Sequence, residues 1–332
     1  MERLTVLGAG SWGTTLADIL AQKGFEVMLW ARDPLLASAI RRERENVPYL
    51  PGVKLSPDLN PTASLEEALS GSSFIVSAVP SHGLRDVFSS ARPFIQKDAI
   101  IVSASKGIEE TTLLTARAII EDVLKDTPYR DVSVLSGPTF AKEVSVKLPA
   151  AVCAASRSNE AAERVQLAFS TQYFRVYTNP DIIGVELGGA LKNVIAIAAG
   201  ICDGLALGSN ARAALITRGL AEISRLGVKM GASPMTFSGL SGLGDLILTS
   251  TGHLSRNYTV GYEIGLGRKL PEITGKMKMV AEGVKTSRAS RALAERHGVE
   301  MPIASEVCRV LYEGKDPRDA VLELMMRGLK GE

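Results

Sequence analysis

Short apolar runs rich in β-branched residues alternate with amphipathic stretches over the first 180 residues or so. Runs of this length and composition are typical of buried strands. They predict strands at Leu4–Leu7, Glu26–Trp30, Phe74–Ala78, Ala99–Ser103, Val132–Leu135, Ala151–Ala155 and Phe174–Tyr177. Strands that alternate with helices favour an α/β fold, in which a mostly parallel sheet is covered by helices.

Two helix starts stand out between these strands. A helix over Ser11–Lys23 follows the first strand, and Gly24 is placed to end it in a left-handed conformation. Another begins at Ser64, where Ser64 and Glu67 have the spacing of a capping box that satisfies two amide groups.

The hydrophobic pattern changes after Tyr177, where strand-like runs become scarce. Asn179 can cap a helix and Pro180 suits its first turn. The remainder is rich in Ala, Leu, Glu and Arg, with glycine-rich breaks at 239–244 and 261–267. We therefore expect an α/β domain over 1–180 and a mainly α-helical domain over 181–332.

Composition narrows the class of protein. With 332 residues, 45% of them hydrophobic, the chain can bury a large core, and two domains are expected. Its net charge of +2 and interspersed charges indicate neither a nucleic-acid arm nor a polybasic membrane patch. The first strand begins near residue 4 and leaves no room for a signal peptide, which suggests a cytoplasmic protein without membrane insertion. The three cysteines and three histidines are scattered, so we expect no disulfide framework and no metal site.

A glycine-rich turn between the first strand and the first helix carries the clearest chemical signal. Gly8, Gly10 and Gly13 form the GxGxxG pattern, with Ser11 and Trp12 inside it. The first glycine allows the tight turn, the second lets backbone approach a pyrophosphate, and the third lets helix and strand pack closely. This context predicts a Rossmann-type domain that binds a dinucleotide.

The end of the second strand bears on the choice of cofactor. An acidic residue there would bind the adenosine ribose, whereas an arginine would favour a 2′-phosphate. The sequence has Arg32 followed by Asp33. Arg32 favours NADPH, and Asp33 keeps NADH open if its side chain turns toward the ribose.

A candidate catalytic lysine lies in the most apolar segment, Asp181–Ile201, which predicts a buried central helix. Lys192 is costly to bury there unless it is paired, deprotonated or working in a cleft. Gly184 and Gly188 share its face, and Gly189 lies beside it, which suggests the close approach of a nicotinamide and a small substrate. Helix packing with a snorkelling lysine is the alternative.

Other polar groups follow strands or glycine turns. Lys106 comes after the strand Ala99–Ser103, at the sheet edge where such folds bind ligands, and two lysines at one site could hold an anionic substrate. The glycine turns at 136–139 and 242–245 expose amide groups, and Ser, Arg and Asn at 255–257 can donate hydrogen bonds. Groups of both kinds are suited to binding phosphate.

Together these motifs resemble the bacterial NAD(P)-dependent glycerol-3-phosphate dehydrogenases along essentially the whole chain. The residues that carry the resemblance are Gly8–Gly13 with Thr14, Ser136-Gly137-Pro138-Thr139-Phe140-Ala141, Glu186-Leu187-Gly188-Gly189-Ala190-Leu191-Lys192-Asn193, Gly242–Asp245, Ser255-Arg256-Asn257 and Ala281-Glu282-Gly283. The resemblance implies reversible hydride transfer between NAD(P)H and dihydroxyacetone phosphate, which gives sn-glycerol 3-phosphate for phospholipid synthesis. It also implies a homodimer.

The resemblance assigns roles to individual positions. Lys192 matches the family's proton donor and acceptor at the substrate C2 oxygen. The implied substrate positions, besides Lys192, are Lys106, Gly137, Thr139, Asp245, Ser255, Arg256 and Asn257. The implied cofactor positions are Ser11, Trp12, Arg32, Tyr49, Lys106, Ala141, Arg256, Val280 and Glu282. Thr139 stands where many relatives have serine, and Asp245 could either orient Lys192 or hold a substrate hydroxyl.

Two other functions remain open from the residues alone. A β-hydroxyacid dehydrogenase of the 6-phosphogluconate or 3-hydroxyisobutyrate type also has a helix lysine, but its asparagine comes four residues later. Here Asn193 follows Lys192 directly and Ala196 occupies the later position. A non-catalytic NAD(P)H-sensing module would have no need for a buried lysine.

Overall fold

The computed structural model describes residues 2–277, 279–329 and 331. Its contacts divide the chain into two compact units. The first unit contains the chain up to Lys106 together with Leu114–Glu186, and the second contains Gly107–Leu113 together with the chain from Leu187 onward. The division falls inside the long helix α8 (Ile182–Gly204) rather than at the expected boundary between residues 180 and 181.

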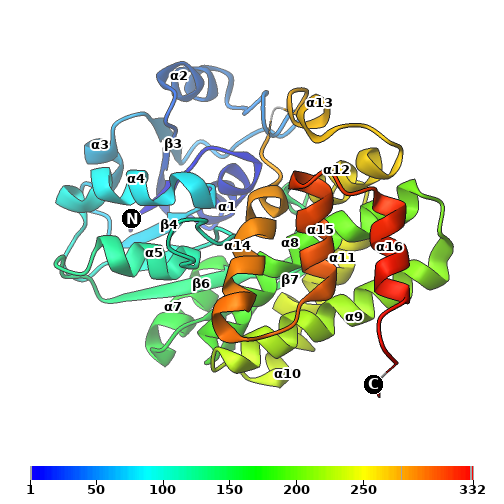
Figure 1. Ribbon diagram of the computed structural model, residues 1–332. Coiled ribbons are helices and arrows are strands. Elements are labelled where there is room, and N and C mark those ends of the chain that lie inside the picture. The colour runs from blue at the N-terminus through cyan, green and yellow to red at the C-terminus, as the bar shows by residue number, and fades with distance from the viewer. Residues whose placement is uncertain (1, 278, 330, 332) are drawn as a thin grey trace. The chain divides into compact units, whose positions relative to one another are not determined.

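The first unit is built on an eight-stranded sheet of order β3-β2-β1-β4-β5-β6-β7-β8 (Figure 1). The strands are β1 (Arg3–Leu7), β2 (Glu26–Trp30), β3 (Leu59–Thr62), β4 (Phe74–Ser77), β5 (Ile100–Ser103), β6 (Asp131–Ser136), β7 (Ala150–Ala155) and β8 (Phe174–Asn179). Neighbouring strands are parallel except β6 and β7, which are antiparallel. The predicted mostly parallel, Rossmann-type sheet is confirmed.

Strand β3 is the one strand of this sheet that the hydrophobic pattern does not predict. Its sequence, Leu-Asn-Pro-Thr, contains two residues that are rare in strands. Pro61 pairs with Leu29 of β2, and β3 lies at the edge of the sheet, where a residue without an N–H group is tolerated. The other strands begin and end within a few residues of their predicted bounds.

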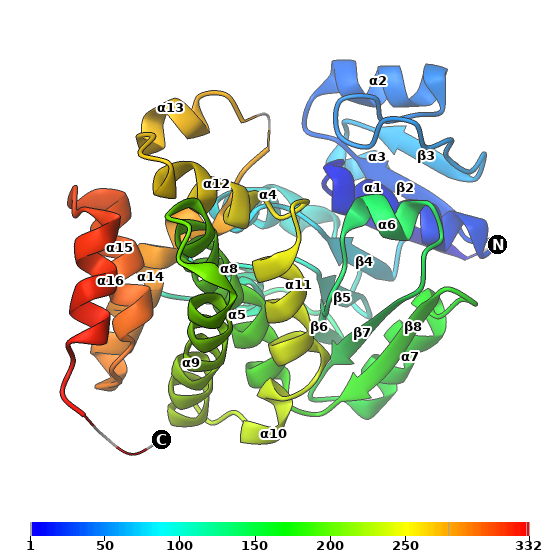
Figure 2. The same cartoon turned by 90° about the vertical axis from the view of Figure 1, so that its right-hand side faces the viewer.

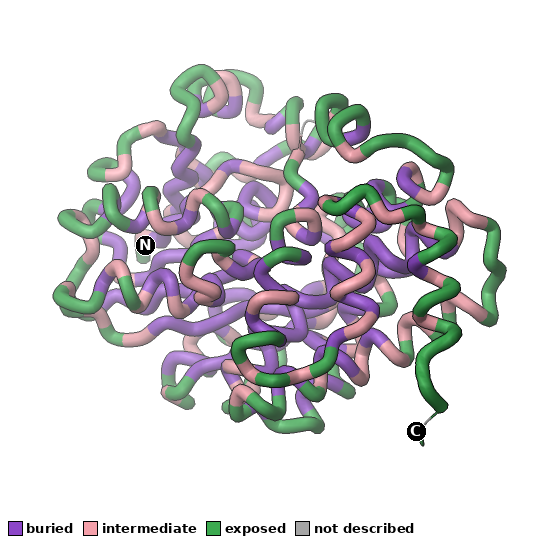
Figure 3. Tube along the Cα trace, viewed as in Figure 1, coloured by how far each residue is buried: buried purple, intermediate pink, exposed green. Residues whose placement is uncertain are grey.

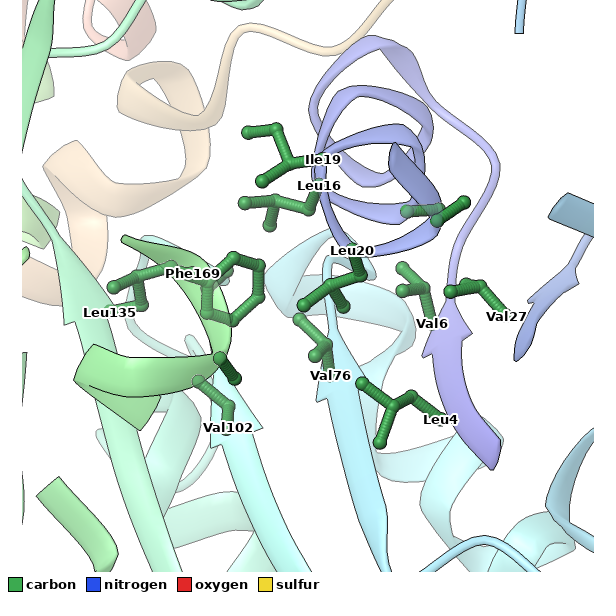
Figure 4. Packing of buried hydrophobic residues seen from close by; sticks show 14 of the residues in the cluster. Leu4, Val6, Leu16, Ile19, Leu20, Val27, Val76, Val102, Leu135 and Phe169 are labelled. Atoms are coloured by element: carbon green, nitrogen blue, oxygen red, sulfur yellow. The ribbon is translucent and has the colours of Figure 1, made fainter. Parts of the chain in front are cut away.

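Helices cover both faces of the sheet. They are α1 (Ser11–Gln22), α2 (Pro34–Glu43), α3 (Leu65–Leu69), α4 (Ser81–Ala91), the short 3-10 helix η1 (Arg92–Phe94), α5 (Ala116–Val123), α6 (Ala141–Ser145) and α7 (Asn159–Phe169). Leu4 and Val6 point to one face, where they join Leu20 of α1 and Phe169 of α7 in one apolar cluster (Figure 4). The alternate residue Leu7 joins residues of α3, α4 and α5 on the opposite face. Figure 3 shows these strands among the buried, purple segments.

The predicted end of α1 and the predicted start of α3 agree with the structure in part. Helix α1 ends at Gln22, and Gly24 has the expected positive φ of 90°. Ser64 caps α3 by accepting the Glu67 N–H at 3.1 Å. The reciprocal half of the predicted capping box is wrong, because the Glu67 carboxylate accepts the Thr62 hydroxyl and Thr62 in turn accepts the Ser64 N–H at 3.1 Å.

From Leu187 onward, the described residues of the second unit form helices and connecting segments and no strand (Figure 2). Its helices are the remainder of α8, α9 (Gly208–Lys229), α10 (Pro234–Phe237), the π-helix η2 (Leu240–Gly244), α11 (Asp245–Thr251), α12 (Arg256–Gly265), α13 (Leu270–Thr274), α14 (Glu282–His297), α15 (Pro302–Tyr312) and α16 (Pro317–Met325). The predicted helical domain is confirmed.

Helix α8 is the core of this unit. By length and composition alone, α8 could cross a membrane. However, 94% of its most apolar window is buried inside the protein, as in the core helix of a soluble protein. Its last turns pack on α12 through glycines: a Cβ atom added to Gly204 would lie 2.9 Å from the Cα atom of Gly265. The two helix backbones can approach this closely because neither carries a side chain at the crossing.

Candidate functional site

The glycine turn of the first unit has the geometry that a pyrophosphate requires. Gly8 has a φ of 110°, and a Cβ atom added to Gly13 would overlap the Gly8 carbonyl. Gly10 is the N-cap of α1 without a side-chain cap, and a Cβ atom added there would meet no atom within 4 Å. The first turn of α1 also carries no acidic residue. This turn therefore fits a dinucleotide phosphate, because helix N-termini bind anions through their N–H groups.

The end of β2 presents the two residues that bear on cofactor choice. Asp33 is the N-cap of α2, and its Oδ1 atom accepts the Leu35 N–H at 2.9 Å. Arg32 is exposed. Asp33 is thus already engaged with its own helix, whereas the neighbouring Arg32 is exposed to solvent.

Four of the expected cofactor positions of this unit, Ser11, Trp12, Tyr49 and Ala141, lie on or beside α1. Ser11 donates its hydroxyl proton to the Tyr49 carbonyl, and Trp12 packs on the apolar core below. The Thr15 hydroxyl donates to the Ala141 carbonyl at 3.4 Å. The structure thereby places the backbone of Tyr49 and Ala141 beside the helix that follows the glycine turn.

Three of the expected substrate positions meet at the carboxyl edge of the sheet. Lys106 follows β5, and its Nζ atom donates to the Gly137 carbonyl at 3.2 Å. The Thr139 hydroxyl donates to the same carbonyl at 3.3 Å. Gly137 is packed so closely that an added Cβ atom would lie 2.8 Å from the Cα atom of Val152. Lys106, Gly137 and Thr139 thus form one polar cluster in the first unit.

In the second unit, Lys192 of α8 is buried and paired. Its Nζ atom donates to the carboxylate of Asp245, which is fully buried, and to the Thr249 hydroxyl at 2.6 Å. Asp245 and Thr249 stand one turn apart on α11. A buried ammonium group needs such partners, because desolvation without them would be prohibitive. The sequence left open whether Lys192 is paired, deprotonated or placed in a cleft. The structure shows that Lys192 is paired and that Asp245 orients its Nζ atom.

The expectation that Gly188 leaves space for a ligand is wrong. A Cβ atom added to Gly188 would lie 2.6 Å from the Ser241 carbonyl oxygen, so the bare position admits the backbone of η2 instead. Since η2 leads directly into α11, this close packing sets where Asp245 and Thr249 stand relative to Lys192.

Asn193 and Asn257 link three helices next to the lysine. The Asn257 Nδ2 atom donates to Asn193 Oδ1 at 2.9 Å, and the Asn257 Oδ1 atom accepts the Gly283 N–H at 2.9 Å. The Ser255 side chain caps α12 by accepting the Tyr258 N–H at 3.2 Å. Ser255 and Asn257 thus have packing roles, and Asn257 has a second amide proton besides the one it gives to Asn193.

The last expected positions lie where α12 and α14 begin. The Arg256 Nη1 atom donates to the Val280 carbonyl at 2.7 Å, and Glu282 is the first residue of α14. Burial lowers the pKa of the Arg256 guanidinium, and the negative charge of Glu282 opposes this effect. Arg256, Val280 and Glu282 are therefore brought together within the second unit.

Sequence reasoning did not single out Thr249 or Asn193 for a role. The spacing of four residues between Asp245 and Thr249 was the available signal for the first. Across the described residues, no cluster of three or more His, Cys, Asp or Glu side chains could hold a metal ion, and the three cysteines are free and buried.

Two family models match the chain. The model described as "NAD-dependent glycerol-3-phosphate dehydrogenase N-terminus" matches residues 3–162, and the corresponding C-terminus model matches residues 181–322.

Relatives and solved structures agree with these matches. A glycerol-3-phosphate dehydrogenase [NAD(P)+] of Geobacter sp. (strain M21) is 57% identical over 331 residues, covering 100% of this chain and 99% of the relative. The relative of the same name from Myxococcus xanthus is 51% identical, covering 99% and 98%. The crystal structure of glycerol-3-phosphate dehydrogenase from Coxiella burnetii superposes with a TM-score of 0.94 at 40% identity, covering 98% of this chain and 99% of that one. The chain therefore belongs to the NAD(P)-dependent glycerol-3-phosphate dehydrogenase family of oxidoreductases.

Proposed function

We propose that the protein catalyses the reversible reduction of dihydroxyacetone phosphate by NAD(P)H to sn-glycerol 3-phosphate. The observation that carries the proposal is Lys192, a buried lysine held by Asp245 and Thr249 on the core helix of a chain that belongs to this family along its length. A core helix has no structural need for an ammonium group, so a chemical role accounts for its cost.

In the synthetic direction, Lys192 acts as the general acid. Its ammonium group polarises the substrate C2 carbonyl and gives a proton to the developing alkoxide oxygen. In the reverse direction the neutral amine takes that proton back. Asp245 stabilises the protonated form and, with Thr249, holds the amine in one direction.

A bound nicotinamide supplies the hydride. Gly8, Gly10 and Gly13 form the turn that would hold its pyrophosphate, through the N–H groups that begin α1. We propose NADPH as the preferred cofactor, because Arg32 is suited to a 2′-phosphate while the Asp33 carboxylate already caps α2. Ser11, Trp12, Tyr49, Lys106, Ala141, Arg256, Val280 and Glu282 complete the proposed cofactor site.

The remaining polar groups are assigned to the substrate. Lys106 and Thr139, which meet at the Gly137 carbonyl, bind its polar groups. Arg256 and the second amide proton of Asn257 serve its phosphate, beside the cap residue Ser255. In this proposal residues 1–180 form the dinucleotide-binding domain, which also contributes Lys106 and Thr139 to substrate binding. Residues 181–332 form the substrate-binding and catalytic domain, which also contributes Arg256, Val280 and Glu282 to the cofactor site.

We propose a cytoplasmic homodimer that supplies sn-glycerol 3-phosphate for glycerophospholipid synthesis.

Initial rates with dihydroxyacetone phosphate and each reduced cofactor test the proposal. We expect NADPH oxidation that depends on dihydroxyacetone phosphate, with a lower KM for NADPH than for NADH. Oxidation with the keto counterpart of a β-hydroxyacid, and none with dihydroxyacetone phosphate, would instead assign the chain to the hydroxyacid chemistry. Cofactor binding without turnover of either substrate would indicate a sensing module.

A further inference from the structure

A groove in the second unit lies among α8, α9, α15 and α16, and its residues have no part in the proposed chemistry. Its volume is about 400 Å³, within the range of small-molecule sites, and most of its lining is apolar. Helix α16 and the segment after it form one wall, where Met325 and Leu329 are 78% and 104% exposed. Figures 1 and 3 show α15 and α16 side by side and the exposed segment after α16.

One face of α9 runs along the groove, and its side chains change from apolar to charged along the helix. Leu207, Ala211 and Leu215 are spaced by four residues, so they line its first part with apolar surface. This part is ~12 Å long, at a rise of 1.5 Å per residue. Val307 and Val310 of α15 also line the groove. The first part of the groove is therefore suited to an alkyl chain.

The same face of α9 becomes charged in its second part. Arg218, Glu222 and Arg225 follow one another at the spacing of successive turns, and Arg327 is also part of the lining. Arg225 donates to the Glu300 backbone carbonyl at 3.2 Å, and Arg327 pairs with the Glu300 carboxylate at 2.8 Å. The guanidinium groups of Arg225 and Arg327 each have five N–H donors, so these contacts use only part of their capacity.

The acidic groups of the lining are engaged with the protein itself. Glu222 is 2% exposed and accepts the N–H groups of Ile303 and Ala304, at 2.8 and 3.2 Å, where α15 begins. Glu306 pairs with Lys315 at 2.5 Å and with Arg309 at 2.9 Å. Near this end of the groove Arg218, Arg225 and Arg327 outnumber the carboxylates of Glu222 and Glu300, so its net charge is positive.

We propose that this groove binds an anionic amphiphile, a long-chain alkyl carboxylate, with its alkyl chain along Leu207–Leu215 and its carboxylate at Arg218, Arg225 and Arg327. An apolar channel that ends in guanidinium groups matches both parts of such a molecule, because arginine pairs with carboxylates in a bidentate manner. This site is additional to the proposed dehydrogenase site and does not depend on it.

Calorimetric titration of the full chain with dodecanoate, below its micelle concentration, tests the site. We expect one molecule bound per chain, and no comparable binding of dodecyltrimethylammonium, which has the same chain and the opposite charge. Arg225→Glu should weaken dodecanoate binding at least tenfold, and Ala211→Trp should abolish it by filling the apolar part. The matched controls Arg175→Glu and Leu167→Trp change exposed residues of the first unit and should leave binding unaltered.

Several outcomes would overturn the proposal. These are equal binding of the anion and the cation, or unchanged dodecanoate binding in both groove variants. Sedimentation of the wild type and Ala211→Trp provides a further check: a wild-type dimer that the variant dissociates, without dodecanoate binding, would assign the groove to a second copy of this chain. Arg225→Glu replaces an exposed residue, so it keeps the test decisive if Ala211→Trp fails to fold. Rates with dihydroxyacetone phosphate are measured separately, so failure here is distinct from failure of the proposed function.

Discussion

At the scale of single residues, the arrangement around Lys192 leads to a direct prediction. Lys192→Ala removes the proposed general acid, which typically contributes about 10²–10⁴-fold to rate. We expect kcat to fall by that factor while NADPH binding, followed by cofactor fluorescence, is nearly retained. Lys229→Ala, at an exposed position of α9, is the control and should keep full activity. Parallel loss of turnover and cofactor binding would show that the lysine is structural.

The role of Asp245, the partner of Lys192, can be tested through the pH dependence of kcat. Asp245→Asn keeps the shape of the side chain but removes the charge that stabilises the ammonium form of Lys192. In the reduction direction activity requires that form, so the fall in kcat on the alkaline side should begin at a lower pH in the variant. Asp98→Asn, at an exposed position, should leave the profile in place. A lower kcat with an unchanged profile would mean that Asp245 acts on the substrate instead.

Arg32 carries the prediction about the cofactor. Arg32→Ala should raise the KM for NADPH much more than the KM for NADH, because only NADPH has the 2′-phosphate that the guanidinium would bind. Arg42→Ala changes an exposed arginine that pairs with its neighbour Glu43 at 2.7 Å, and should alter neither constant. Equal increases for the two cofactors in Arg32→Ala would refute the contact.

At the scale of elements, Gly188 shows what helix-level patterns leave open. The four-residue spacing of Gly188 and Lys192 correctly places both on one face of α8, but the spacing alone does not distinguish a ligand from a packed backbone. Strand β3 escaped prediction for a similar reason, because it pairs with β2, which lies elsewhere in the sequence. The contacts of Thr62 with Ser64 and Glu67 are local, but Thr62 is the last residue of the strand that was not predicted. Local propensity predicted the remaining strands, whose side chains are buried in the sheet.

The packing of η2 on α8 gives a testable consequence. In Gly188→Ala the new Cβ atom would lie 2.6 Å from the Ser241 carbonyl, so η2 must move. Overpacking of this kind costs about 1–3 kcal/mol, and the shift should also carry Asp245 away from Lys192 and lower kcat. Chemical denaturation and steady-state rates measure the two effects.

Gly83→Ala on α4 is the matched control for this substitution. A Cβ atom there would have its nearest neighbour at an ordinary 3.7 Å, so we expect stability to be kept or slightly raised. If Gly188→Ala is as stable and active as Gly83→Ala, the close approach of η2 does not position the site.

At the scale of the whole molecule, the sequence could predict a Rossmann-type sheet and a helical C-terminal part, but not how the polar groups pair within them. The glycine turn, the strand-end Arg32 and the buried Lys192 each carry a local signature that sequence analysis can find. The roles of Asp245, Thr249 and Asn193 depend on how helices meet, since their contacts join residues more than 50 positions apart. Motifs therefore predicted the chemistry, and tertiary packing decides how each group is held.

Buried acids give the whole molecule a pH-dependent stability. Burial raises the pKa of Glu222 from 4.5 to about 7, and this effect outweighs the N–H groups of Ile303 and Ala304, which lower it. Burial also raises the pKa values of Glu186 and Asp18. The folded protein therefore holds protons that the unfolded chain releases. For Glu222, this contribution to stability is full below about pH 4.5 and is lost as pH rises through about 7.

The size of this effect can be measured at Glu222. A shift from 4.5 to about 7 corresponds to about 3 kcal/mol between pH 4.5 and 8, so the wild-type free energy of unfolding should fall over this interval. Glu222→Gln keeps an acceptor for the α15 amides but has no charge to bury, and its stability should depend less on pH. Glu272→Gln, at an exposed position of α13, should retain the wild-type slope. If Glu222→Gln and Glu272→Gln have the same slope in urea unfolding at pH 5, 6, 7 and 8, water must reach the Glu222 carboxylate, because only solvation would let it ionise without cost.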